Sequence, residues 1–195
     1  MDLTEFWTVV EAARAEVGGV LGEDGGEEMA ESLVRRLVTL QPSEIVDFAA
    51  HFDRLHDQAY RWDVWAAAYL IMGGCSDDGF IDFRAGLIAL GRQTFESTLA
   101  DPDSLAGQSV VRAIAAEDLS EDVLSMEEVN YAGGEAYEQV TGVEDGIDEQ
   151  LQAREGDREP AGGDPAGEEW DFDDDAEMSR RLPRLAALFF EEADD

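Results

Sequence analysis

Apolar residues recur at helical spacing along most of the chain. Over residues 2–17 the apolar positions fall on one side of a helix, and Asp2 with Glu5 has the pattern of a capping box at its start. Similar stripes predict further helices over residues 29–40, 42–55, 60–72, 80–90, 91–100, 105–116 and 119–139. We therefore expect an all-α fold, a compact multi-helix orthogonal bundle that occupies residues 1–142.

The segment over residues 60–72 is the most apolar of these helices, with apolar side chains nearly all round. A helix of this kind is buried on most of its sides, so we expect it to be the central helix of the domain. Two glycines at positions 73–74 end it. Any of Ser76, Asp77 or Asp78 is able to cap the helix that follows, because their side-chain oxygens accept hydrogen bonds from free backbone N–H groups.

The helical periodicity stops at residues 143–168, where Glu, Asp, Gly, Pro and Ala dominate. We interpret this stretch as an acidic flexible linker. An apolar pattern returns in residues 169–195, and Pro183 is expected to kink or restart the helix there. We expect this C-terminal segment to pack on the helical domain, with Trp170 as an anchor.

The chain is strongly acidic: 47 Asp and Glu residues stand against 13 cations, all of them Arg, for a formal net charge of −34. Such a field repels nucleic acid and anionic membranes and attracts basic proteins, so we expect a basic protein partner and neither of the other two. A single cysteine, an N-terminus unlike a signal peptide and the lack of an apolar run long enough to span a bilayer predict a cytoplasmic protein.

Several short motifs stand out along the chain. They are Phe6-Trp7, Ile45 with Phe48, Trp65-Ala66-Ala67, Gly73-Gly74-Cys75-Ser76-Asp77-Asp78, Phe83-Arg84, Leu87-Ile88, Asp101-Pro102-Asp103-Ser104-Leu105, Tyr137 with Thr141-Gly142, and Trp170 with Pro183-Arg184-Leu185. Together they resemble the bacterial family catalogued as domain of unknown function 4240. The resemblance covers most of the chain except residues 144–167, and it implies no catalytic residue.

The turn after the most apolar helix concentrates the groups that could perform chemistry. The candidate pocket around it consists of Trp65, Tyr69, Cys75, Asp77, Asp78 and Arg84. A thiol at a helix N-terminus can be a nucleophile because the helix dipole lowers its pKa, but the two nearby carboxylates oppose that effect, and a buried, inert cysteine is favoured. The two aspartates could pair with Arg84, which would either fix the turn or form part of a binding site.

We expect no metal and no cofactor. His51 and His56 lie on one predicted helix about 140° apart, so they are poorly placed to share a metal ion. The aspartates of residues 171–175 alternate as in a calcium loop, but the glycine and the glutamate that an EF-hand requires are missing. No phosphate loop, dinucleotide fingerprint or nucleophile elbow is present in the sequence.

Three classes of function remain. The first, which we favour, is a binding or regulatory module of the adaptor or immunity type that recruits a basic protein through its acidic surface. The second is an enzyme with a pocket around Trp65, Cys75, Asp77, Asp78 and Arg84. The third is a mimic of the charge of DNA, which requires ordered carboxylates spaced like phosphates.

Overall fold

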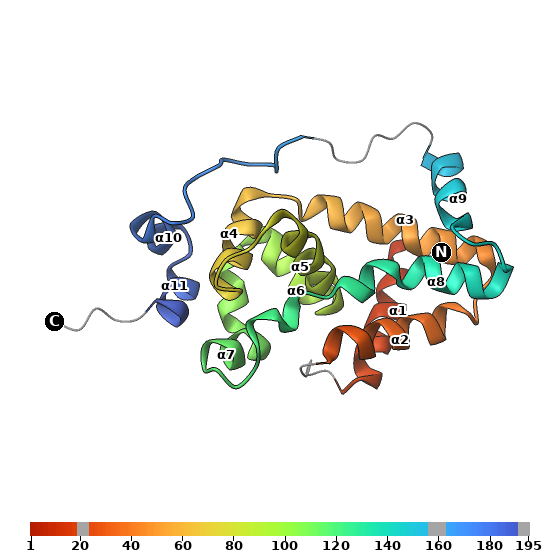
Figure 1. Ribbon diagram of the computed structural model, residues 1–195, viewed down its shortest axis with the longest axis horizontal. Coiled ribbons are helices and arrows are strands. Elements are labelled where there is room, and N and C mark those ends of the chain that lie inside the picture. Colours follow the sequence, from red (N-terminus) through yellow and green to blue (C-terminus); the bar gives the residue numbers. More distant parts are fainter. Residues whose placement is uncertain (19–23, 156–162, 191–195) are drawn as a thin grey trace.

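The computed structural model describes residues 1–18, 24–155 and 163–190, and this part of the chain is all-α (Figure 1). Its helices are α1 (Leu3–Glu16), α2 (Gly25–Leu37), α3 (Pro42–Gln58), α4 (Trp62–Ile71), α5 (Asp77–Ala89), α6 (Arg92–Ala100), the 3₁₀ helix η1 (Pro102–Gly107), α7 (Ser109–Ala115), the 3₁₀ helix η2 (Glu121–Leu124), α8 (Glu127–Thr141), α9 (Gly146–Glu155), α10 (Asp175–Arg181) and α11 (Pro183–Phe189). No helix in these ranges has the length and hydropathy to cross a membrane.

The helix starts follow local sequence chemistry. The Asp2 carboxylate accepts from the backbone N–H of Thr4 and Glu5, and the Glu5 side chain accepts from the N–H of Asp2, so the predicted capping box is confirmed. Of the three possible caps of α5, Ser76 serves: its Oγ accepts from the N–H of Gly79 at 3.1 Å. Pro183 restarts the chain as α11 after α10 has ended.

The centre of the fold is α5, which packs against α1, α3, α4, α6, α8 and η2. Phe80, Phe83 and Leu87 on this helix are each only 1% exposed. At Gly86 the η2 backbone comes so close that a Cβ atom would lie 2.2 Å from the carbonyl oxygen of Leu124. The prediction that α4 is the central helix is therefore wrong.

Helix α4 is apolar nearly all round although it is not the central helix of the fold. Its small residues Ala66, Ala67 and Ala68 are fully buried, whereas its aromatic residues Trp62 and Trp65 are only partly buried. These aromatic side chains form a surface that the C-terminal segment covers. The apolar sequence thus reflects coverage from two sides, by the bundle and by residues 163–190.

The C-terminal segment docks back on the helical domain, as predicted. Helix α11 packs on η1, α4 and α7, at the left of Figure 1. The ring of Phe172 lies 5.5 Å from that of Tyr69 and 6.1 Å from that of Trp62, so Phe172 makes the main aromatic contact with α4. Trp170 contacts Phe172, with ring centroids 5.5 Å apart, and lies under the guanidinium of Arg181 at 4.3 Å, so it organises the segment itself.

The stretch interpreted as a linker contains ordered structure. Helix α9 lies within it, with Ile147 only 8% exposed against α3 and α8, so the expectation of an irregular segment is wrong for Gly146–Glu155. Ala166 is also paired with the domain: its N–H donates to the carbonyl of Tyr60, and its carbonyl accepts from the N–H of Trp62. Residues 156–162 lie outside the described part of the chain.

Candidate functional site

The residues of the pocket predicted from the sequence are only partly brought together. Trp65, Asp77 and Arg84 line one concavity of about 390 Å³, together with Tyr60 and with residues of α3 and α5 such as His56. Tyr69, Cys75 and Asp78 do not line it. Tyr69 instead donates a hydrogen bond from its hydroxyl to Asp173, 2.5 Å away on the C-terminal segment.

Arg84 is held by hydrogen bonds to backbone carbonyls and by contact with an aromatic ring. Its guanidinium donates to the carbonyl oxygens of Phe80 at 3.2 Å and His56 at 3.1 Å, and lies 4.8 Å from the centre of the Tyr60 ring. An ion pair with Asp77 or Asp78 is not among the contacts of the described residues. Arg84 is 7% exposed. Because its guanidinium donates to carbonyls of both helices, Arg84 ties α5 to the end of α3.

His56 and Cys75 are both poor candidates for acid–base or nucleophilic chemistry near neutral pH. Burial lowers the pKa of His56 to about 4, with a further contribution from the Arg84 charge, so the imidazole is neutral and its Nε2 donates to the carbonyl of Ile81. Burial raises the pKa of the Cys75 thiol to about 11, and the carboxylates of Asp77 and Asp82 act in the same direction. The thiolate is therefore a minor species.

His51 lies away from this concavity. Its Nε2 lies 3.2 Å from the carbonyl oxygen of Met1, and Asp47 pairs with the Met1 amino group. Over the residues that the structure describes, no group of three His, Cys, Asp or Glu side chains is arranged to hold a metal ion.

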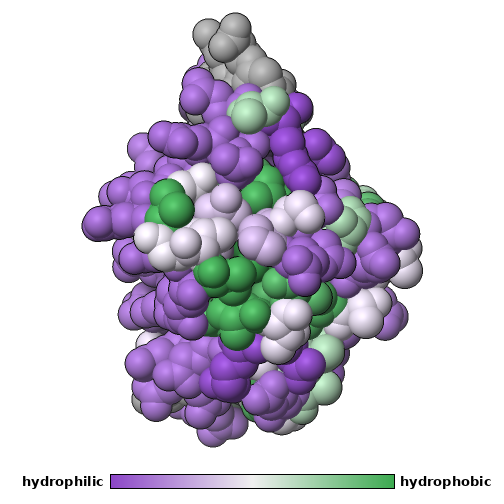
Figure 2. Space-filling view, turned by 90° about the vertical axis from the view of Figure 1, so that its right-hand side faces the viewer, coloured by the Kyte–Doolittle hydropathy of each residue, from purple (hydrophilic) through white to green (hydrophobic). Residues whose placement is uncertain are grey.

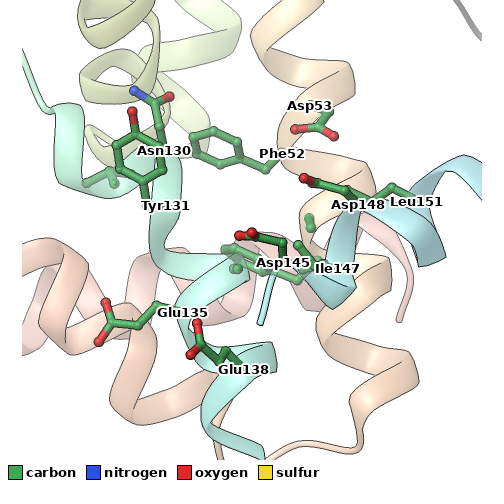
Figure 3. A pocket seen from close by; sticks show the side chains of 15 residues that line it. Phe52, Asp53, Asn130, Tyr131, Glu135, Glu138, Asp145, Ile147, Asp148 and Leu151 are labelled. Carbon is green, nitrogen blue, oxygen red and sulfur yellow. The ribbon is translucent and has the colours of Figure 1, made fainter. Parts of the chain in front are cut away.

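A second concavity, absent from the sequence prediction, lies between α3, α8 and α9 (Figure 3). Its volume of about 570 Å³ falls within the range of ligand pockets in general. We call it the α3–α8–α9 groove. Its apolar floor consists of Phe48 and Phe52 from α3 and Ile147 and Leu151 from α9.

Carboxylates surround that apolar floor. The acidic residues that line the groove are Asp53, Glu135, Glu138, Asp145 and Asp148, and no described residue that lines it is Arg or His. They come from α3, from α8, and from α9 with the loop before it, so three parts of the chain supply one sign of charge. A surface of this composition favours a ligand that has cationic groups on apolar stems.

Two consecutive glycines of α8 line the groove. A Cβ atom at Gly133 would lie 3.4 Å from the Cβ of Ala49 on α3, and one at Gly134 would lie 3.7 Å from Cγ2 of Ile147 on α9. Each interior glycine disfavours a helix by about 1 kcal/mol relative to alanine. A Cβ atom at either position would thus make ordinary van der Waals contact, so an alanine fits there and the two glycines leave only little volume unfilled beside α3 and α9.

The end of the molecule that carries α9 also exposes apolar side chains. Figure 2 views the right-hand end of Figure 1, and apolar atoms gather in the middle of an otherwise hydrophilic face. Val140 and Val143, at the end of α8, are 37% and 51% exposed, and Tyr131 of the groove is 63% exposed. Apolar contact area is therefore available beside the carboxylates.

Sequence reasoning missed this groove because one of its walls was assigned to the linker. The available signal was the spacing of Ile147 and Leu151, one helical turn apart within acidic residues, together with the glycine pair of α8. Neither signal identifies a groove without knowledge of which helices lie beside each other.

Comparison with known proteins gives a family and no activity. The model of a family described as a protein of unknown function (DUF4240) matches residues 1–139. The motifs around Trp170 and Pro183 lie beyond that match, as do α9, α10 and α11. No curated protein and no solved structure matches the chain.

Proposed function

The chain belongs to the DUF4240 family of proteins of unknown function, and we propose that it is a protein-binding module whose α3–α8–α9 groove takes up a cationic segment of a partner protein. The observation that carries the proposal is the composition of the groove: an apolar floor, five carboxylates around it and no cation among the described residues that line it.

Lysine and arginine side chains match this surface in both of their parts. Their methylene stems can lie on apolar side chains such as Phe52 of α3 and Val129 of α8 while their charged ends meet carboxylates such as Glu135 and Glu138. The net charge of −34 adds long-range attraction, which raises the rate of association with a basic protein and weakens as salt is added. The groove thus supplies a local site within a surface that is attractive overall.

The concavity around Arg84 supports an enzymatic function less well. Cys75 lies outside it and its thiol is mostly protonated, because burial raises its pKa to about 11. His56 is held neutral by burial and occupied by the carbonyl of Ile81. The Cys75 thiol and the His56 imidazole are therefore poorly suited to act as a nucleophile and a base.

The test uses an amidated peptide rich in Arg and Lys, titrated into the full chain and followed by calorimetry at two salt concentrations. The groove variant carries Glu135→Gln and Glu138→Gln. A matched control carries Glu27→Gln and Asp118→Asn, which remove the same charge at exposed positions outside the groove. Two partly exposed charge contacts are each worth up to about 1 kcal/mol, so we expect the groove variant to bind about tenfold more weakly.

The control should bind within about twofold of the unmodified chain, and both affinities should fall as salt is added. Equal losses in the two variants would mean that the peptide responds to total charge and not to the groove. An affinity that does not change with salt would also contradict the proposal.

A further inference from the structure

Helix α9 occupies a surface of α3 and α8 through few contacts. Among its side chains, Ile147 is buried, Leu151 is half-buried and Arg154 forms an ion pair with Asp47. Arg154 also donates to the carbonyl oxygen of Ser43 at 3.2 Å. The contacts thus fall at intervals of four and three residues, which is the pattern of a helix that recognises a groove.

We propose that α9 is an intramolecular placeholder, which a cationic amphipathic helix of the partner protein displaces from α3 and α8. This rests on the function proposed above and adds the structure of the partner segment. The partner helix carries two apolar residues one turn apart and an Arg one further turn along, as α9 does, with additional Lys or Arg on its flanks.

Charge favours the partner over α9. Helix α9 brings Asp148 to a groove whose wall on α8 carries Glu135 and Glu138, so both helices bring negative charge to it (Figure 3). A cationic helix on the same surface replaces that repulsion with attraction. The apolar side chains that α3 and α8 contribute, among them Phe48, Phe52 and Val129, remain available to either helix.

The attachment of α9 is also suited to release. Its ten residues fall short of the length at which a helix is stable in isolation, so it depends on its contacts with α3 and α8. The loop before it contains Asp145 with a φ of 53°, in the left-handed region that an aspartate adopts less readily than a glycine. An element with few buried side chains opens at a lower free energy than the core of the protein.

The proposal and its alternative, in which α9 stays in place as a wall of the groove, predict opposite changes in affinity when the attachment of α9 is weakened. If α9 competes with the partner, weakening its attachment raises the fraction of open protein and therefore the apparent affinity. If α9 is a wall, the same change damages the site. Arg154→Ala weakens the attachment, because it removes the contacts with Asp47 and Ser43 without altering the groove lining.

The probe is a synthetic, amidated helical peptide with Ile, Leu and Arg at the spacing of the α9 contacts and Lys on its other faces; a scrambled peptide of equal composition is the control. We expect Arg154→Ala to bind it about threefold more tightly than the unmodified chain. Gln150→Glu, which makes the same change in charge at an exposed position of α9, should leave the affinity nearly unchanged. Glu138→Gln should weaken binding, because it removes a carboxylate of α8 that stays in place when α9 leaves.

Amide hydrogen exchange with saturating peptide supplies the direct readout, and exchange within α9 should become faster. Weaker binding by Arg154→Ala, or slower exchange in α9, would show that α9 stays in place; the groove would remain a binding site and only the displacement would be refuted. Failure of every variant and the unmodified chain to bind would instead refute the proposed function. A dimer formed at high concentration without peptide, with α9 exchanged between copies, would assign the surface to a second copy and overturn the proposal.

Discussion

Asp103 in η1 binds Arg184 in α11, although the two residues are 81 positions apart in sequence. The carboxylate accepts from the backbone N–H of Arg184 at 3.0 Å, from its Nε at 2.9 Å and from the backbone N–H of Leu185 at 2.8 Å. Asp103 is 3% exposed. It therefore caps α11 from another part of the chain and holds the C-terminal segment on the domain.

We predict that Asp103→Ala lowers the free energy of unfolding by about 2 to 4 kcal/mol, because it removes a helix cap and leaves buried backbone N–H groups without an acceptor. Asp101, which also pairs with Arg184 but is 57% exposed, is the matched control, and Asp101→Ala should cost less than about 1 kcal/mol. Urea unfolding of the two variants measures the difference. Equal effects would contradict the assignment of Asp103 as the cap.

This contact shows what local sequence patterns do and do not determine. The Asp-Pro-Asp-Ser sequence of residues 101–104 indicates a turn that caps the helix directly after it. The turn is present, with the N–H of Ser104 donating to the carbonyl of Asp101, and the chain continues as η1. The cap is made to α11 because the proximity of η1 and α11 is a property of the tertiary fold. Asp2, whose partners lie within three residues, is a cap that the sequence predicts correctly, and Ser76 is one of the three caps that the sequence allows for α5.

The difference between local pattern and tertiary packing also explains which properties of the helices the sequence predicted and which it did not. Periodicity predicted the all-α fold and the return of the C-terminal segment, because apolar stripes identify helices that must be covered. It failed to identify α5 as the central helix, since α5 contains Gly86 and the buried Arg84, which make its composition less apolar than that of α4. The groove was missed because it depends on which helices are neighbours.

The close approach of η2 to α5 gives a second prediction. Gly86→Ala should lower the free energy of unfolding by about 1 to 3 kcal/mol, because the new methyl group would overlap the Leu124 carbonyl oxygen, and alanine returns at most about 1 kcal/mol in helix propensity. Gly134→Ala on α8 is the control: its Cβ would sit in ordinary contact 3.7 Å from Ile147, so stability should rise or stay the same. Thermal unfolding of both variants is sufficient, and a stable Gly86→Ala protein would disprove the close contact.

His56 gives a prediction on pH. Burial lowers the pKa of His56 in the folded state to about 4 from its ordinary value of 6.5, so the unfolded chain binds more protons between these two pH values. Stability from this group is therefore complete above about pH 6.5 and is lost as the pH falls towards 4. Between pH 7 and pH 5 the loss should be about 2 kcal/mol in the free energy of unfolding.

The His56→Gln variant isolates that contribution. Glutamine keeps an N–H able to donate to the Ile81 carbonyl but does not titrate, so its stability should change less over this pH range than that of the unmodified chain. The carboxylate shifts, among them the pKa of Asp82 raised by burial and that of Glu177 lowered to about 2 by hydrogen bonds from Arg180 and Arg181, are common to both proteins and cancel in the comparison. Parallel pH profiles for the two proteins would contradict the burial of a neutral His56.

The thiol of Cys75 separates the enzymatic alternative from the binding module. Burial raises the pKa of the thiol to about 11 from an ordinary value of 9.0, so its thiolate fraction near neutral pH is about 100-fold below that of an unperturbed thiol. Alkylation by iodoacetamide at pH 7.5 should therefore be at least about 100-fold slower in the folded protein than after unfolding in urea, and Cys75 is the single thiol that can react. Mass spectrometry of the modified chain over time measures both rates. Rapid alkylation of the folded protein, saturating at one group, would reveal an activated thiolate and restore the case for a nucleophilic enzyme at the start of α5.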